Sequence, residues 1–524
     1  MNFNNVIRVP DHKSLNRFLL IYPVLFGLFS FLINKALDFQ QLHNDFWDTY
    51  FIARHLQTSI PASLYNPLFP IGYCSFLKLI MGKGLPVVPA IIANIMFGMV
   101  TLFTCSYVYK KFLSLWVALI SLILLSLFPK FFHYFNVGGA DPMSVMFFTL
   151  GTAIIAHALT TPFRYRKWAR SRFLAAGALM GLSAITRYHV FVGSILLLIA
   201  FAVFFRKEWK NFAISFIGFI SIYSIQWAIN LLSGHSLFET GYGSINIYNL
   251  MYNVNYYKTT HLQLPASTLQ IVLQNPLLFF RKYIITLLSL TPCYMPPVIA
   301  AFIVRERAAR NLSKGIALWS IFYFGLFATS TSERQMLIVL PWTLLSAGFI
   351  LQEIWHYINK KTVFKSQLYR FSLIALIMLS MAGLAAKDFM NTMRRAHSRS
   401  AYCTVESYLA NSGLSKANQT FTTDFDLYFR SLPYCMPYFN GGAPRNGTYL
   451  YDKEFPEFPV GSINEFAGYC QKQGVRFVIL TPDCDSLSME LRKVYDEKPA
   501  NGVLMFRKEI NDLRVFEVSR LYNK

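Results

Sequence analysis

The sequence predicts a polytopic α-helical membrane protein of about eleven transmembrane helices, with interfacial helices in its first outer loop and a C-terminal soluble α/β domain. The chain has 524 residues, of which 54% are hydrophobic and only 14% charged, whereas soluble domains carry roughly 25% charged residues. Its apolar residues form blocks long enough to cross a bilayer, such as Leu113–Pro129 and Val190–Phe205. The residues after about Lys387 are polar instead. We therefore expect a membrane domain at 1–386 and an extracytoplasmic α/β domain at 387–524.

The expected membrane spans follow the apolar blocks in chain order. They lie at about 15–36, 87–109, 113–130, 142–161, 173–187, 189–205, 211–233, 283–304, 315–330, 335–353 and 371–386. The first is expected to remain as a signal anchor, because the polar, basic stretch Met1–Arg17 precedes it and no small-residue cleavage site follows.

The basic residues orient these spans. The net charge of +23 is concentrated in short loops between apolar blocks, which indicates the positive-inside rule and excludes a nucleic-acid-binding protein. The basic loops are Tyr109–Lys111, Arg164–Arg172, Arg206–Lys210, Arg305–Lys314 and Asn359–Arg370. With these loops inside, the N-terminus is cytoplasmic, and an odd number of spans places the C-terminal domain outside.

The outer C-terminal segment alternates between strand-like and helix-like patterns, which favours an α/β domain. One helix is marked by Ser462 as its N-cap, Glu465 completing a capping box and Gly474 as its stop. The expected strands are Gln419–Thr423, Val475–Thr481, Gly502–Arg507 and Leu513–Ser519. The segment also holds four cysteines, which permit two disulfides in any of three pairings or remain as four buried thiols: Cys403, Cys435, Cys470 and Cys484.

Two outer loops supply carboxylates. In the first loop, Asp45 and Asp48 stand among Phe46, Trp47, Tyr50 and Phe51, whose aromatic rings suit the membrane interface. Asp141 lies in the next outer loop, immediately before Pro142. All three acids also suit helix starts, where the macrodipole favours negative charge. Because the two loops meet at one membrane face, an acid/base site is the alternative.

Cations at the outer face run against the positive-inside bias, so they indicate an anionic ligand such as a phosphate. The alternative is that they are snorkelling side chains at helix ends. They are Arg187, Lys258, His261, Arg281, Lys282 and Arg334.

Five motifs, in this order, resemble a known family. They are "YFIARHL" (Tyr50–Leu56), "LYNPLFPIGYCSF" (Leu64–Phe76), "ADPMSVMFFTLG" (Ala140–Gly151), "AAGALMGLSAITRYHVF" (Ala175–Phe191) and "ERQMLIVLPWTLLSAG" (Glu333–Gly348). The pattern resembles the GT-C superfamily of glycosyltransferases that use polyprenyl-phosphate sugars. It is similar to the branch that holds the protein O-mannosyltransferases and the aminoarabinose transferase of lipid A.

The resemblance implies roles for particular residues. Asp45 matches the catalytic acid of the first outer loop, Asp141 matches the acid of the second, and Asp48 is a supporting candidate. Donor phosphate binding falls to Arg187, Lys258 and Arg334, because Asn66 stands where relatives often carry a lysine. The substrate-contacting candidates are Trp47, Tyr50, Tyr65, Asn66 and His189. Asp45 and Asp48 do not form an Asp-x-Asp pair, so no metal site or other cofactor is expected, and a divalent metal lacks support.

The expected activity is inverting transfer of a hexosyl or pentosyl group from a polyprenyl-phosphate donor to an acceptor hydroxyl at the extracytoplasmic face. The acceptor is a lipid, a glycan or a protein, and the expected location is the bacterial inner membrane. The alternatives are a transporter or flippase for lipid-linked sugars and a non-catalytic sugar-lipid binding protein. Few charges lie near the centres of the spans, which argues against a transporter.

Overall fold

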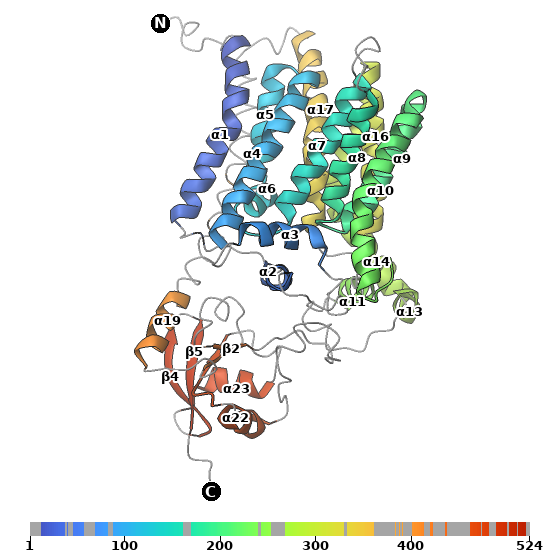
Figure 1. Cartoon of the computed structure of the whole chain (residues 1–524). Coiled ribbons are helices and arrows are strands. Elements are labelled where there is room, and N and C mark those ends of the chain that lie inside the picture. The colour runs from blue at the N-terminus through green and yellow to red at the C-terminus, as the bar shows by residue number, and fades with distance from the viewer. Residues whose placement is uncertain are drawn as a thin grey trace, which may run out of the picture. The chain divides into compact units, whose positions relative to one another are not determined.

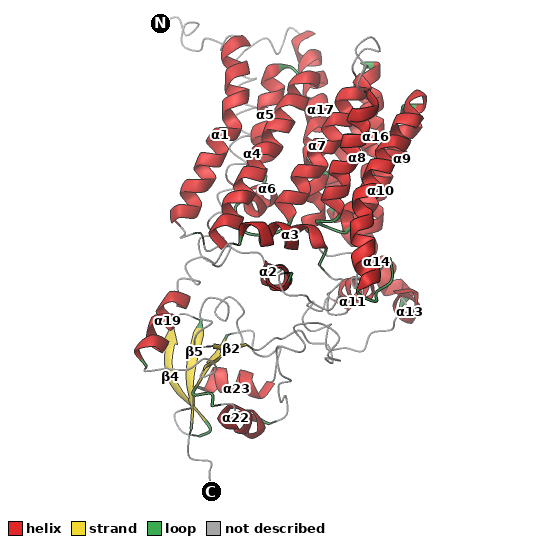
Figure 2. Cartoon of the chain, viewed as in Figure 1, coloured by secondary structure: helices red, strands yellow, loops and turns green. Residues whose placement is uncertain are grey.

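The computed structural model is mostly helical, with one small β-sheet (Figure 1, Figure 2). It describes residues 12–36, 39, 46–56, 69–81, 87–160, 169–238, 243–252, 268–329, 333–360, 383, 387, 390, 401–412, 420–422, 435–437, 462–472, 474–481, 489–499, 502–510 and 512–519. The chain divides into two compact units. The first comprises Met1–Leu56, Pro67–Thr240 and Pro276–Asn391, and the second comprises Gln57–Asn66, Gly241–Asn275 and Thr392–Lys524.

The first unit contains the apolar helices around one large hydrophobic core. Its elements are α1 (His12–Ala36), α2 (Phe46–His55), α3 (Ile71–Ile80), α4 (Val87–Phe112), α5 (Leu115–Leu127), α6 (Pro129–Phe135), α7 (Asp141–Thr160), α8 (Ala169–Ala184), α9 (His189–Phe204), η4 (Arg206–Glu208), α10 (Trp209–Leu232), α14 (Pro276–Ser289), α15 (Thr291–Ile303), α16 (Arg307–Phe327), η5 (Glu333–Ile338) and α17 (Leu340–Lys360). Within the described part of the chain, four helices are long and apolar enough to cross a membrane, or up to six if each bent pair counts as one span. The predicted total of eleven spans stays a prediction.

Three predicted spans differ from the helices observed. The span expected at 113–130 is bent by 62° between α5 and α6, because Phe128 precedes Pro129 and adopts an extended conformation with φ −60° and ψ 123°. The span expected at 283–304 is interrupted after Ser289, between α14 and α15. The span expected at 335–353 begins as the 3₁₀ helix η5, before Pro341 starts α17. The span expected at 371–386 lies almost entirely outside the described residues.

Glycine permits the close packing of α8 against α10. A Cβ atom at Gly177 of α8 would lie 1.8 Å from the Ser215 carbonyl oxygen of α10, and one at Gly218 would lie 2.4 Å from the Leu174 carbonyl oxygen. The Ser215 hydroxyl also donates to the Phe173 carbonyl at 2.7 Å. Small residues at such crossings let two backbones approach closely. The resulting van der Waals contacts stabilise helix association within lipid, where the hydrophobic effect does not drive it.

The segment expected to form the first outer loop contains two short helices, α2 and α3, that contact each other. Figure 1 shows α3 lying crosswise to the long helices, at one end of their bundle. Its face that carries Ile71, Tyr73, Cys74 and Leu77 is buried. This crosswise arrangement agrees with the expected interfacial helices in this loop.

The second unit contains α11 (Gly243–Tyr252), α13 (Thr268–Gln274) and a five-stranded sheet in the order β2-β1-β3-β5-β4. The strands are β1 (Thr420–Thr422), β2 (Cys435–Pro437), β3 (Phe477–Leu480), β4 (Leu504–Ile510) and β5 (Leu513–Val518), and the flanking helices are α19 (Ala401–Asn411), α22 (Ile463–Lys472) and α23 (Met489–Glu497). β2, β1 and β3 are parallel, whereas β5 and β4 run antiparallel to their neighbours.

The sheet is buried on both faces because side chains alternate along each strand. Val478 and Leu480 of β3 join α22 and α23 in one apolar cluster, while Phe477 and Ile479 join α19 in another. The four predicted strands are therefore present, and β2 is an additional one that the sequence pattern did not indicate.

The predicted capping box of α22 is confirmed. The Ser462 amide donates to the Glu465 carboxylate at 3.1 Å, and the Glu465 amide donates to the Ser462 hydroxyl at 3.3 Å. Gly474 follows with a φ of +74°, the left-handed conformation that glycine adopts readily. Cys470, on the same helix, is a buried free thiol, and the side chains of the other three cysteines of this segment are not among those described.

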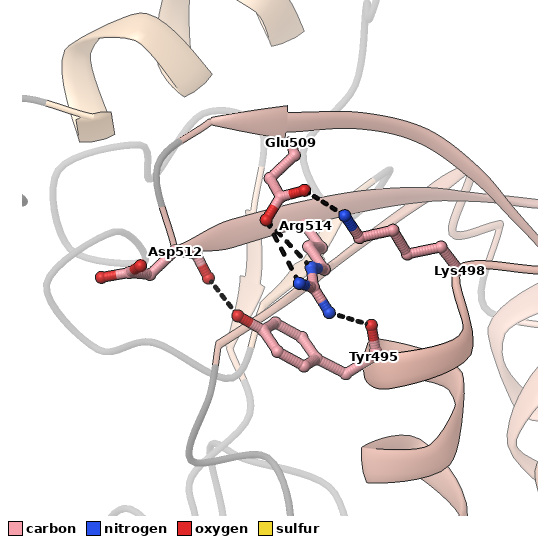
Figure 3. A network of polar contacts seen from close by, with 5 residues as sticks. All are labelled: Tyr495, Lys498, Glu509, Asp512 and Arg514. Carbon is pink, nitrogen blue, oxygen red and sulfur yellow. Dashed lines mark hydrogen bonds and ion pairs between the residues drawn. The ribbon is translucent and has the colours of Figure 1, made fainter.

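A polar network fixes the β4–β5 hairpin to α23 (Figure 3). Glu509 accepts hydrogen bonds from Lys498 and from Nε and Nη2 of Arg514, the latter two at 3.3 and 3.2 Å. Arg514 also donates to the Tyr495 carbonyl, and its guanidinium lies 3.9 Å from the centre of the Tyr495 ring. The Tyr495 hydroxyl donates to the Asp512 carbonyl at 2.9 Å, which closes the network.

The α8–α10 crossing gives the first prediction. Gly177→Ala should destabilise the protein, because the new methyl group would overlap the backbone of Ser215. Gly325→Ala is the matched control, since the nearest atom outside its own helix turn, the Tyr283 hydroxyl oxygen, would lie 3.7 Å from the new Cβ. Thermal unfolding in detergent should show a clear fall in the apparent melting temperature for Gly177→Ala alone. Equal melting temperatures would show that the helices tolerate separation here.

A second prediction concerns pH and the sheet. Burial raises the pKa of Glu517, but hydrogen bonds from Arg476 and Arg507 outweigh it and bring the pKa below the usual 4.5. A lowered pKa in the folded state stabilises the protein above the unfolded pKa, and this stabilisation disappears as the pH falls through the folded pKa. Hydrogen exchange in β4 and β5, corrected for intrinsic rates, should therefore accelerate between pH 6 and pH 3, and less so in Glu517→Gln.

The control for this prediction is Glu490→Gln, which removes an exposed ion pair with Lys493 and should leave the pH dependence nearly unchanged. If Glu517→Gln and the unmodified protein lose protection equally on acidification, the ion pairs of Glu517 do not contribute.

Candidate active site

The site is centred on a buried ion pair between Asp141 and Arg187. Asp141 is the first residue of α7 and Arg187 lies in the turn between α8 and α9. Arg187 Nη2 lies 2.7 Å from Asp141 Oδ2, and the side chains are only 12% and 3% exposed. A charge-assisted hydrogen bond of this length is strong, and it offsets part of the cost of removing both charges from water. The sequence nominated both residues, separately, and the structure brings them into direct contact.

Two serines fix the helices that carry this ion pair. Ser144, one turn after Asp141, and Ser183, one turn before Arg187, lie with their hydroxyl oxygens 2.9 Å apart. The Ser183 hydroxyl donates to the Ser144 carbonyl at 2.7 Å, and the Ser144 hydroxyl lies 3.2 Å from the Ser183 carbonyl. The Arg187 amide in turn donates to the Ser183 carbonyl at 3.0 Å. These reciprocal bonds set the register of α7 against α8, and hence the separation of Asp141 and Arg187.

Helix α3 is attached to the same end of the bundle through backbone atoms. The Gly72 amide donates to the Ile185 carbonyl at 2.7 Å, an approach in which a Cβ atom at Gly72 would lie 2.7 Å from the same oxygen. The Ile71 amide donates to Gln226 Oε1 at 2.9 Å, and Gln226 donates to Asn230 at 2.8 Å. The first backbone amides of α3, which have no acceptor within the helix, thereby gain hydrogen-bond acceptors.

Tyr73 is a site residue that the sequence analysis missed. The side chain is almost fully buried and lies beside the Gly139 backbone, within electrostatic range of Asp141 and Arg187. Burial raises the pKa of Tyr73, although Arg187 acts against this. The phenol therefore stays protonated at neutral pH and can donate a hydrogen bond. Its position in "PIGYCSF", directly after the glycine that packs against Ile185, was the available signal.

Two further predicted residues belong to the same cluster. His189, the first residue of α9, interacts electrostatically with Asp141, Arg187 and Arg334, and its ring packs edge-on against Phe327 at 6.1 Å. Arg334 lies on η5, which is held to α16 by a hydrogen bond from Tyr323 to the Gln335 carbonyl at 3.1 Å. Among the described residues of this cluster, two arginines and one carboxylate interact with His189, so the local charge suits an anion.

The remaining predicted residues are not brought into this cluster by the described structure. Tyr50 is buried on α2, and Trp47 and Asp48 lie on the same helix, without described side chains. Four others lie outside the described residues: Asp45, Tyr65, Asn66 and Lys258. Among the described residues, no group of three His, Cys, Asp or Glu side chains is placed to hold a metal, and the need for one remains untested.

Comparisons with known proteins place the fold. No family model matches the sequence, and no curated protein matches it. The structure is similar to that of ArnT from Cupriavidus metallidurans bound to undecaprenyl phosphate, with 12% identity, a TM-score of 0.58 and coverage of 95% of this chain and 98% of that chain. It is also similar to the oligosaccharyltransferase AglB from Archaeoglobus fulgidus in complex with an inhibitory peptide and a dolichol-phosphate, with 10% identity, a TM-score of 0.50 and coverage of 97% and 75%. The chain thus has the fold of ArnT and of this oligosaccharyltransferase.

The ion pair yields a third prediction. Arg187→Leu should lower stability by about 3–5 kcal/mol, because it removes the close partner of a buried carboxylate. Replacing both residues, Asp141→Leu with Arg187→Leu, should recover much of the loss, since no charge of the pair then remains buried. Thermal unfolding of the natural chain and of these two variants in one detergent measures this. A double variant that is less stable than Arg187→Leu would contradict the assignment of the loss to the unpaired charge.

Proposed function

We propose that this chain is an inverting membrane glycosyltransferase that moves a sugar from a polyprenyl-phosphate donor to an acceptor hydroxyl. The observation that carries the proposal is the charged cluster of Asp141, Arg187, His189 and Arg334 at one end of an apolar helical unit, in which Asp141 is buried and the other three side chains are partly buried. The fold supports it, because the similar ArnT and AglB structures hold undecaprenyl phosphate and dolichol-phosphate.

The cluster suits the phosphate of a lipid donor. Arg187 and Arg334 present fixed positive charge, and Tyr73 adds a neutral hydrogen-bond donor beside them. In a buried site such groups stabilise the charge that develops on a departing phosphate more strongly than they would in water. Asp141 holds Arg187 by a 2.7 Å contact, so in this proposal it orients the cation and balances part of its charge.

In the proposed reaction, Asp45 is the general base. It takes the proton of the acceptor hydroxyl while the oxygen attacks the anomeric carbon from the side opposite the phosphate. The bond between the anomeric carbon and the phosphate oxygen breaks, and its electron pair leaves on the lipid phosphate. One displacement inverts the anomeric centre. Because the donor is already activated by its phosphate, the reaction requires no nucleotide at this face.

The proposed setting follows from the charge pattern of the loops. The site faces the extracytoplasmic side, in the inner membrane of a bacterium, and the donor enters from the bilayer. The cluster lies near the outer end of the bundle in this topology, whereas a flippase or transporter requires charged groups near the bilayer midplane.

The fourth prediction tests the base. In cells that lack the protein, the natural chain should restore the missing glycan or glycolipid, whereas Asp45→Asn should reduce the product by about 10²–10⁴-fold, the range expected for loss of a general base. Asp48→Asn, on the same loop, is the matched control and should restore it. Mass spectrometry of envelope glycans and lipids provides the measurement.

Two outcomes would count against the proposal. Full restoration by Asp45→Asn would remove Asp45 from the chemistry. If lipid-linked sugar crossed reconstituted membranes without any transfer, the protein would be a transporter instead.

A further inference from the structure

Asn94 of α4 is a fully buried amide within an apolar helix. Its Nδ2 atom donates to two backbone carbonyls of the link between α6 and α7, that of Val137 at 2.6 Å and that of Gly139 at 2.9 Å. Only one residue, Ala140, separates Gly139 from Asp141 in the chain. A single side-chain nitrogen thus fixes the backbone directly before the carboxylate of the site.

A second asparagine holds the other end of the same link. Asn34 of α1, also fully buried, donates to Asn136 Oδ1 at 2.9 Å, and Asn136 donates to the Phe132 carbonyl at 2.8 Å. The link between α6 and α7 is therefore attached to α1 at its start and to α4 at its end.

Two site residues depend on the position of this link. Tyr73 lies against the Gly139 backbone, and Asp141 starts α7, with the Ser144 amide bonded to the Ala140 carbonyl at 3.2 Å. A shift of Gly139 would move Asp141 away from Arg187 and open the contact with Tyr73. Asparagine is suited to this task because both hydrogens of one amide nitrogen can meet two carbonyl oxygens.

We propose that Asn94 is a positioning residue for the Asp141–Arg187 pair, and thus for the phosphate site of the proposed transferase. This inference rests on the proposed function for its catalytic consequence, but its structural part stands independently. Asn94 acts through the backbone of Gly139 and touches no substrate.

The test is a double-mutant cycle of Asn94→Leu and Asp141→Asn, measured by donor-dependent sugar transfer. Asn94→Leu alone should lower kcat/KM by about 100-fold, the effect expected from misplacing a catalytic group by about 1 Å. In the Asp141→Asn background the same substitution should cost less than about threefold, because the group that it positions is already lost. Effects that multiply would overturn the proposal.

A matched control separates positioning from general destabilisation. Thr343→Val removes another buried bond between helices, from the Thr343 hydroxyl to the Cys293 carbonyl at 2.6 Å. It should lower the melting temperature as Asn94→Leu does. It should leave kcat/KM within about twofold of the value for the natural chain. If Asn94→Leu does not fold, Asn94→Asp serves instead, since it keeps the size and replaces the nitrogen that donates to both carbonyls with an oxygen.

A structure of the Asn94 variant decides the structural part without any assay. We expect the distance between Arg187 Nη2 and Asp141 Oδ2 to exceed hydrogen-bonding range. A contact retained at 2.7 Å would refute the positioning role, whatever the activity. If the natural chain transfers no sugar while the variant loses this contact, the proposed function fails and the positioning role stands.

Discussion

The structure of the helical unit depends on keeping one carboxylate and one guanidinium together away from water. Removing two charges from water costs several kcal/mol per ion, and a close contact repays this only when its geometry is held. Asp141 and Arg187 are 46 residues apart in the chain, with Asp141 at the start of α7 and Arg187 in the turn after α8. Their contact therefore requires that α7 and α8 have one fixed register, which the bonds between Ser144 and Ser183 provide.

Polar groups within apolar helices recur around this pair, and each one fixes backbone. Asn94 bonds to the link before Asp141, and Gln226 bonds to the first amide of α3. Unsatisfied polar groups are expensive in a hydrocarbon environment, so their occurrence in membrane helices indicates a specific partner. The end of the bundle that carries Asp141 is thus organised by side chains that bond to the main chain of neighbouring segments.

Much of the fold was predictable because the physics involved is local. Apolar block length located α4, α7 and α10, and the Ser462–Glu465 capping box located α22. The bend at Pro129 follows from the same local rules, although the long apolar block hid it. The candidate site was predictable only in part. The sequence analysis named Asp141, Arg187, His189 and Arg334, but their proximity depends on the tertiary structure. Asn94 was missed because one amide in an apolar run has no distinguishing local pattern, and Tyr73 was missed because the glycine before it shows its packing role only in the tertiary structure.

Helices α8 and α9 meet at the turn that carries Arg187, and each has only 16 residues. At 1.5 Å per residue such a helix reaches about 24 Å, less than the hydrocarbon thickness of about 30 Å. A short span is accommodated by local thinning of the bilayer or by flanking side chains that reach outward. One end of each of these short helices is the turn that carries Arg187. On the proposed function, thinning of the bilayer at this end would bring lipid headgroups closer to the turn and shorten the path of a donor phosphate to its site.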